Sequence, residues 1–155
     1  MNRFILRLCV VLGALMVFAI LPAAPQAAAA PSCYGDYCSG KNPYSTGCSA
    51  NSYRWGSATV RTSSPGSSYY DQSASAGRLE LWISRSCATR WARLVLTDHA
   101  ASSGSILAVV QSDGYRKAHA WQPREPGTYY TAQIYSRNKC SRAVYGGWST
   151  GCTVW

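Results

Sequence analysis

The residues that could perform acid–base chemistry are few, since the 155-residue chain holds six acidic residues and two histidines. A glycosidase needs two carboxylates that face each other across a sugar, and only Glu80 lies in a segment with clear strand alternation. Asp98 and His99 are neighbours that point apart on an extended chain, and no G-x-S-x-G motif supplies a nucleophile. We therefore predict no catalytic residue and no cofactor. A hydrolase that acts on wall polymers is our third hypothesis, after the two non-catalytic functions given at the end of this section.

Cysteine is the other chemically capable residue type. The segment "CYGDYCSGKNPYSTGC" has the spacing C-x4-C-x9-C, and we call residues 33–48 the cysteine clamp. Structural zinc sites favour paired C-x2-C motifs, which are missing from this sequence, so we predict no metal site. The chain holds seven cysteines, and six remain in the exported domain once Cys9 is removed with the signal peptide described below. An even number of cysteines in a small exported domain indicates disulfides, although six cysteines allow 15 pairings and the sequence selects none of them. The predicted disulfide residues are Cys33, Cys38, Cys48, Cys87, Cys140 and Cys152.

The segment 1–29 has the order of a secretory signal peptide. Arg3 and Arg7 precede the apolar run 8–21, and small residues ending in Ala29 follow. Cleavage there removes Cys9 and the two arginines, which lowers the net charge from +9 to +7 and leaves residues 30–155 as one domain. We expect a secreted, extracellular monomer, either released or wall-associated, whose mature form has no membrane span.

The elements that must position these residues are strands. In "RLELWIS", Leu79, Leu81 and Ile83 alternate with polar positions, and "RWARLVLT" is apolar enough for a buried strand. "TYYTAQIYS" is a further strand and "SRAVYGG" a weaker one, which places the predicted strands within residues 78–147. The polar segment 61–78 is long for a connection, and its function stays open. We predict an all-β domain, a small disulfide-linked antiparallel sandwich or barrel.

Asp113-Gly114 lies between two alternating segments and favours a type I′ turn, which predicts a hairpin. Counting outward, Val110 faces Lys117 and Ala108 faces His119. One face of the hairpin carries small apolar side chains that suit a core, namely Leu107, Val109, Ala118 and Ala120. The other face is our candidate binding face: Tyr115, Lys117, His119 and Trp121. Aromatic rings there could stack on sugars or bases, or could instead cover a second buried surface.

Fifteen basic residues against six acidic ones favour a polyanionic partner. Outside a cell, such partners are anionic wall polymers, anionic lipid head groups and stray nucleic acid. We nominate Arg90 and Arg93, which flank Trp91, as candidate basic contacts, with stacking of guanidinium on indole as the alternative. We expect no specific nucleic acid partner, because no recognisable nucleic-acid-binding module is present.

Three segments of the chain resemble a known family. They are "CYGDYCSGKNPYSTGC", "GRLELWISRSCATRWARL" and "YYTAQIYSRNKCSRAV". Together they resemble small exported proteins of Gram-positive bacteria, catalogued as domain of unknown function 2690. The resemblance covers nearly all of residues 30–155 and implies an exported, cysteine-linked domain without an established activity.

The sequence thus favours a non-catalytic domain that binds an envelope polymer or another polyanion. The alternative is a secreted effector directed at another extracellular protein, such as a peptidase inhibitor or a competition factor. Its candidate inhibitor loop is "WQPREPGTYY", where Pro123 and Pro126 restrain Arg124 for a trypsin-like pocket. A plain proline-rich turn would have the same sequence.

Overall fold

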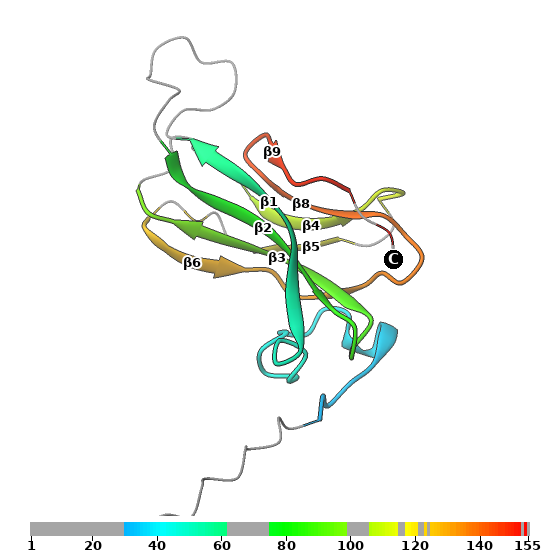
Figure 1. The fold of residues 1–155 in the computed structure, drawn as a ribbon. Helices are drawn as coiled ribbons and strands as arrows, with labels where there is room; N and C mark the ends of the chain where they lie inside the picture. The colour runs from blue at the N-terminus through cyan, green and yellow to red at the C-terminus, as the bar shows by residue number, and fades with distance from the viewer. Residues whose placement is uncertain are drawn as a thin grey trace, which may run out of the picture.

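Two antiparallel sheets pack face to face in the computed structural model (Figure 1), which describes residues 30–61, 75–98, 106–114, 117–120, 123, 125–152 and 154. The first sheet contains β1 (Ser52–Arg61), β2 (Ser75–Ser84), β3 (Thr89–Leu96) and β6 (Gly127–Tyr130) in that order, with β7 (Ile134–Tyr135) also pairing with β3. The second sheet has the order β5 (Lys117–Ala120), β4 (Leu107–Gln111), β8 (Ser141–Tyr145) and β9 (Trp148–Ser149). The predicted all-β, sandwich-like fold is confirmed.

The core lies between the two sheets because alternate residues of their central strands are apolar. In β2, Leu79, Leu81 and Ile83 are fully buried, as their period of two predicts. From the second sheet, Leu107 and Val109 of β4 join the cluster that contains Leu79 and Leu81. Burial of each such side chain contributes about 1.5–3 kcal/mol, so this cluster is the main source of the sandwich's stability.

The strands extend beyond the predicted range 78–147, because β1 precedes it and β9 ends at Ser149. The alternation of β1 is interrupted: Arg54 pairs with Trp82 and Gly56 with Leu81, which leaves Trp55 as an extra residue in a β-bulge. An inserted residue reverses the inward and outward positions, and this hides the strand from a search for period two.

The β4–β5 hairpin has the predicted register, with Ala108 opposite His119 and Val110 opposite Lys117. The prediction of a type I′ turn at Asp113-Gly114 is wrong. Such a turn requires positive φ at both central residues. Asp113 does not have it, whereas Gly114 has φ 70°. The Gly114 amide instead donates a hydrogen bond to the Gln111 carbonyl at 2.9 Å, so the turn spans 111–114 and only glycine takes the left-handed conformation.

The cysteine clamp lies beyond one end of the sandwich, beside the turn that joins β2 to β3 (Figure 1). It contains a short 3-10 helix, η2 (Gly35–Cys38), and otherwise consists mainly of turns. Within the described ranges we found no α-helix, and accordingly none with the length and hydrophobicity of a membrane span.

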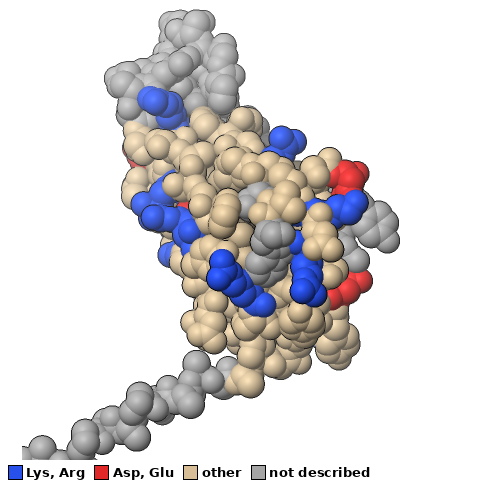
Figure 2. All heavy atoms as spheres, turned by 45° about the vertical axis from the view of Figure 1, so that its right-hand side comes forward, with Lys and Arg blue, Asp and Glu red and all other residues tan. Residues whose placement is uncertain are grey.

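Basic side chains are spread over several parts of the surface rather than gathered into one block (Figure 2). On the face drawn there, Lys and Arg outnumber Asp and Glu, which lie near its margins. Since the basic side chains seen on this face are not gathered in one place, a binding site has to be identified from local geometry.

Candidate functional site

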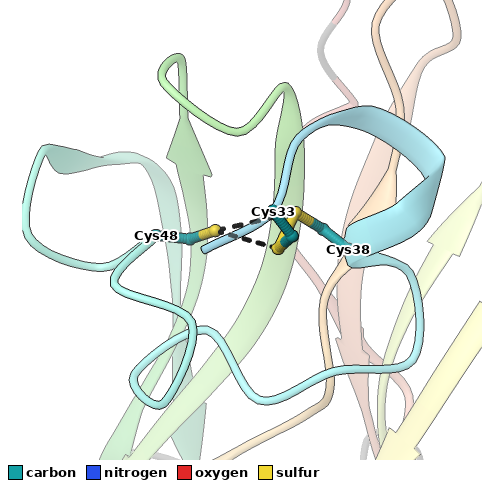
Figure 3. Close-up of side chains that lie close together, drawn as sticks. All are labelled: Cys33, Cys38 and Cys48. Carbon is teal, nitrogen blue, oxygen red and sulfur yellow. Dashed lines mark hydrogen bonds between the residues drawn. A yellow bond between two sulfur atoms is a disulfide. The ribbon is translucent and has the colours of Figure 1, made fainter. Parts of the chain in front are cut away.

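All six predicted cysteines form disulfides: Cys33–Cys38, Cys48–Cys87 and Cys140–Cys152. The first two bridges touch each other, because the Cys48 Sγ lies 3.9 Å from the sulfurs of both Cys33 and Cys38 (Figure 3). The sulfurs of Cys33, Cys38 and Cys48 lie within 4.8 Å of one another, which is close enough for shared metal ligation. However, metal binding requires thiolates, and disulfide formation removes them.

One buried glutamine connects the cysteine clamp to the sandwich. The Gln133 side chain accepts a hydrogen bond from the Thr89 hydroxyl on β3 at 2.7 Å and donates one to the Thr46 hydroxyl at 2.9 Å. Its backbone bonds to Gly40 and Lys41. The clamp is therefore held by polar contacts and disulfides rather than by apolar burial.

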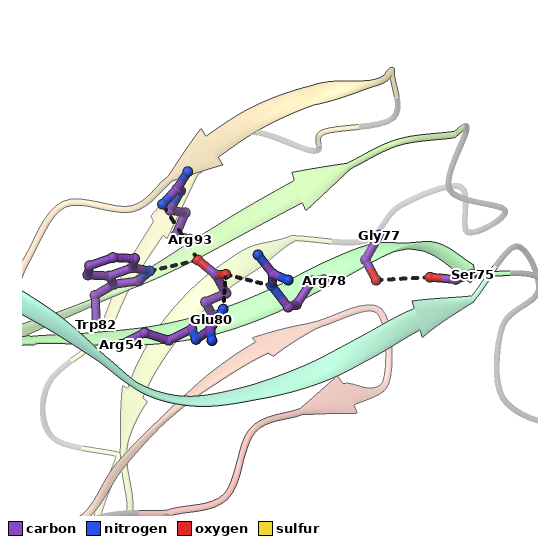
Figure 4. Close-up of polar contacts among 7 residues, drawn as sticks. All are labelled: Arg54, Ser75, Gly77, Arg78, Glu80, Trp82 and Arg93. Atoms are coloured by element: carbon purple, nitrogen blue, oxygen red, sulfur yellow. Dashed lines mark hydrogen bonds and ion pairs between the residues drawn. The ribbon is translucent and has the colours of Figure 1, made fainter.

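Three arginines surround one carboxylate on the outer face of the first sheet (Figure 4). The Oε1 of Glu80 on β2 accepts hydrogen bonds from the Arg78 Nε at 2.7 Å and from the Arg54 Nη1 at 3.2 Å. The Glu80 Oε2 lies 3.7 Å from the Arg93 Nη1. The Trp82 indole N–H donates to the Glu80 Oε2, the oxygen nearer to Arg93, at 2.7 Å. We call Arg54, Arg78 and Arg93 the arginine face. With three cations and one anion, its local charge is +2.

Glu80 stays ionised although its side chain is only 1% exposed. Burial alone would raise its pKa, but hydrogen bonds from Trp82, Arg78 and Arg54 outweigh that effect and hold the pKa of Glu80 below its ordinary value. The arginines remain accessible, at 53% for Arg78, 46% for Arg54 and 31% for Arg93. The carboxylate thus orders the arginine side chains, and each of them stays partly exposed.

Aromatic rings flank the arginine face. Paired residues of adjacent strands share a face, so Glu80, Arg93 and Tyr130 form one row across β2, β3 and β6. The Tyr130 ring packs against Tyr44 of the clamp, with centroids 4.7 Å apart. The Arg93 guanidinium lies 5.4 Å from the centre of the Trp82 ring.

Hydroxyl groups lie on the other side of the arginine face. A shallow cavity of about 330 Å³ is lined by Arg78 together with Thr59, Ser75 and Thr97. A guanidinium beside several hydroxyls can bind an anionic group and the hydroxyls of a sugar or polyol at the same time. The surface therefore combines charge, flat rings and hydroxyls.

The basic contacts proposed from sequence separate into one partly exposed and one buried residue. Arg93 belongs to the arginine face, but its guanidinium lies over Trp82 rather than over Trp91. The nomination of Arg90 is wrong: it points inward, is 0% exposed and donates to the Lys139 carbonyl at 2.8 Å. Burial lowers the pKa of Arg90 to about 10, which still leaves it charged at neutral pH.

The candidate binding face on β5 is described only in part. His119 is exposed, and Ala118 and Ala120 on the opposite side pack against the core as predicted. Tyr115, Trp121 and the Lys117 side chain lie outside the described residues, so ligand binding by this face stays a prediction.

Arg124 also lies outside the described residues, but its two neighbours are described. The Tyr145 hydroxyl donates a hydrogen bond to the Pro123 carbonyl at 2.6 Å. The Tyr129 hydroxyl donates one to the Glu125 carbonyl at 2.9 Å. The main chain on both sides of Arg124 is thus attached to the sandwich.

Arg54 and Arg78 were not among the predicted site residues. The signal for Arg78 is present in "RLELWIS", where Arg78, Glu80 and Trp82 share the polar positions of an alternating strand. Arg54 was harder to find, because the bulge at Trp55 breaks the alternation of β1.

Comparison with known proteins agrees with the resemblance seen in the sequence. A family model described as "Protein of unknown function (DUF2690)" matches residues 36–144. No curated protein and no solved structure matches the chain. The matched region runs from the cysteine clamp to β8 and so includes Glu80 and the arginine face. The protein therefore belongs to the DUF2690 family.

Proposed function

We propose that this protein is an exported, non-catalytic domain that binds an anionic polymer of the bacterial envelope through the arginine face. The observation that carries the proposal is the convergence of three partly exposed arginines on a single buried carboxylate. Since Glu80 neutralises only one of the three charges, a net attraction for polyanions remains. The signal-peptide pattern and the disulfides support a location outside the cell.

The surroundings of the arginine face favour a polymer that carries both sugars or polyols and phosphate groups. Guanidinium groups form bidentate contacts with phosphate. The tyrosine pair of Tyr44 and Tyr130 can stack on a sugar ring, and the hydroxyls beside Arg78 can bond to its hydroxyls. Teichoic acids have this chemistry and are our first choice of ligand.

Cosedimentation with purified walls, with and without their teichoic acid, tests this proposal across a series of salt concentrations. We expect retention by intact walls at low salt, progressive release as salt rises, and several-fold weaker retention once the polymer is removed. The double variant Arg54→Gln/Arg78→Gln should reduce retention by intact walls about tenfold.

Arg142→Gln is the control, because Arg142 is exposed on β8 of the other sheet. It removes one charge without touching the arginine face and should change retention less than twofold. Retention that is independent of salt and polymer would contradict the proposal. An equal loss of binding free energy for each charge removed in the two variants would show that net charge, rather than this face, governs binding.

We propose peptidase inhibition as the second candidate function, because the carbonyls on both sides of Arg124 are held by tyrosine hydroxyls. A restrained loop loses little conformational entropy when it enters a peptidase cleft. We expect inhibition of a trypsin-like peptidase that the Arg124→Ala variant abolishes. No inhibition by the wild type, or undiminished inhibition by the variant, would eliminate this candidate.

A further inference from the structure

A second basic site lies where three distant segments meet, at the end of the sandwich next to the cysteine clamp. It is an open cavity of about 540 Å³ lined by Tyr34, Arg85, Ala88, Arg137 and Asn138. Tyr34 comes from the clamp, Arg85 and Ala88 from the β2–β3 turn, and Arg137 and Asn138 from the connection between β7 and β8. The sequence gives no sign of this cavity, because its lining residues become neighbours only when the chain folds.

The lining of this cavity is cationic, and none of the described residues that form it is acidic. Within the described part of the chain, neither Arg85 nor Arg137 has an ion-pair partner. The adjoining cavity differs, because its Lys139 is neutralised by Asp113 at 3.0 Å. Two uncompensated guanidinium groups beside one cavity form an attractive site for an oxyanion.

The walls of the cavity are held firmly. Arg85 lies with its guanidinium 5.2 Å from the centre of the Tyr53 ring. The Ser136 amide donates to the Ala88 carbonyl at 3.3 Å, and the buried Arg90 donates to the Lys139 carbonyl at 2.8 Å. These bonds attach one end of segment 136–139 to the β2–β3 turn and the other end to β3, and so position Arg137 and Asn138.

Backbone strain occurs at the same place. Ala88 has φ 56° and is the one non-glycine residue with positive φ in the described part of the chain. This conformation costs about 1–2 kcal/mol for a residue with a Cβ, and such strain is concentrated at functional sites. The Cys48–Cys87 disulfide on one side and the Thr89–Gln133 hydrogen bond on the other hold Ala88 in it.

We propose that this cavity is a binding site for a single anionic monosaccharide, independent of the polymer site on the arginine face. Arg85 and Arg137 bind its phosphate or carboxylate group, and Asn138 bonds to a ring hydroxyl. Tyr34, which is 60% exposed, covers the sugar with its ring. The cavity volume of about 540 Å³ is large enough for one sugar.

The test is an NMR titration of the ¹⁵N-labelled, disulfide-bonded protein with glucose 6-phosphate, glucuronate, glucose and inorganic phosphate. We expect the two anionic sugars to shift the amides of residues 85–88 and 137–138. Whichever of the two binds more tightly identifies the preferred oxyanion. Glucose and inorganic phosphate should each bind at least tenfold more weakly, because each lacks half of the recognised chemistry.

Arg85→Gln and Arg137→Gln should each weaken binding of the anionic sugar about tenfold, whereas Arg142→Gln, at an exposed position on β8 outside both proposed sites, should leave it unchanged. Inorganic phosphate binding as tightly as the sugar phosphate would overturn the assignment to a sugar. Glucose binding equally well, or the absence of shifts at residues 85–88 and 137–138, would overturn the site. The shift mapping uses the wild-type protein, so it decides the question even if a variant fails to fold.

Discussion

The cysteine clamp and the sandwich are stabilised in different ways. The sandwich has a cluster of buried aliphatic side chains such as Leu81 and Val109 between its sheets. The clamp region has a separate cluster made of cysteines alone: Cys33, Cys38, Cys48 and Cys87. Disulfides stabilise mainly by restricting the unfolded chain, whereas apolar burial stabilises the folded state directly.

This difference shows how a segment without aliphatic side chains can be ordered. Its tyrosines remain largely at the surface, with Tyr34 and Tyr37 at 60% and 73% exposure. Crosslinks and the bonds of Gln133 replace apolar burial and leave these rings at the surface. Both proposed sites use this arrangement, because the clamp contributes Tyr44 to the first and Tyr34 to the second.

The largest effect should follow removal of the Cys48–Cys87 bridge, which joins the clamp to the sandwich across a sequence separation of 39. Cys48→Ala/Cys87→Ala should lower the free energy of unfolding by about 4 kcal/mol in urea denaturation, because a long loop is released. Cys33→Ala/Cys38→Ala is the matched control, with a sequence separation of only 5. Opening that short loop should cost about 2 kcal/mol. A larger loss for the short loop would contradict the entropic explanation.

A core truncation should weaken the sandwich by a comparable amount. Leu81 is fully buried. Leu81→Ala should lower the free energy of unfolding by about 3 kcal/mol in urea denaturation, through lost burial and a cavity. Ile106 is 46% exposed and serves as the control. Ile106→Ala should cost less than about 0.5 kcal/mol, as is usual for surface positions. Equal losses would mean that the sandwich does not depend on this cluster.

Gln133→Leu should loosen the junction between the two regions. The change removes both hydrogen bonds of the Gln133 side chain, so the Thr46 and Thr89 hydroxyls each lose one hydrogen-bond partner. The loss should lower the free energy of unfolding by about 2 kcal/mol. Hydrogen exchange should accelerate at the Gly35 and Gly40 amides of the clamp and stay slow in β2. Uniform acceleration in both regions would show that the clamp and the sandwich unfold as one unit.

The smallest expected effect on the free energy of unfolding is that of Glu80→Gln, and it depends on pH. The folded-state pKa of Glu80 lies below its ordinary value. Its stabilisation is therefore fully present above the unfolded pKa of about 4.3 and is lost as pH falls through the folded pKa. Because the arginines are partly exposed and screened, Glu80→Gln should cost only about 1 kcal/mol at neutral pH.

This difference between Glu80→Gln and the wild type should vanish in acid, and denaturation curves measured from pH 7 to pH 3 test it. The same variant should bind walls more tightly, since it removes the one neutralising charge of the arginine face. A pH-independent difference in stability would contradict the role given to the Glu80 carboxylate.

Several features of this protein were determined by sequence alone. The alternation of Leu79, Leu81 and Ile83 predicted both the strand and the side that faces the core, because side chains of a strand alternate between its faces. An even set of six cysteines predicted disulfides. These inferences succeed because they depend on local geometry and composition.

Other features were decided only by tertiary structure. The pairing of Cys48 with Cys87, the inward position of Arg90 and the meeting of Arg85 with Arg137 depend on which distant segments become neighbours. The bulge at Trp55 reversed the alternation that would have revealed Arg54. Contacts between residues far apart in sequence leave no periodic trace along the chain, so folding alone determines where these charges gather.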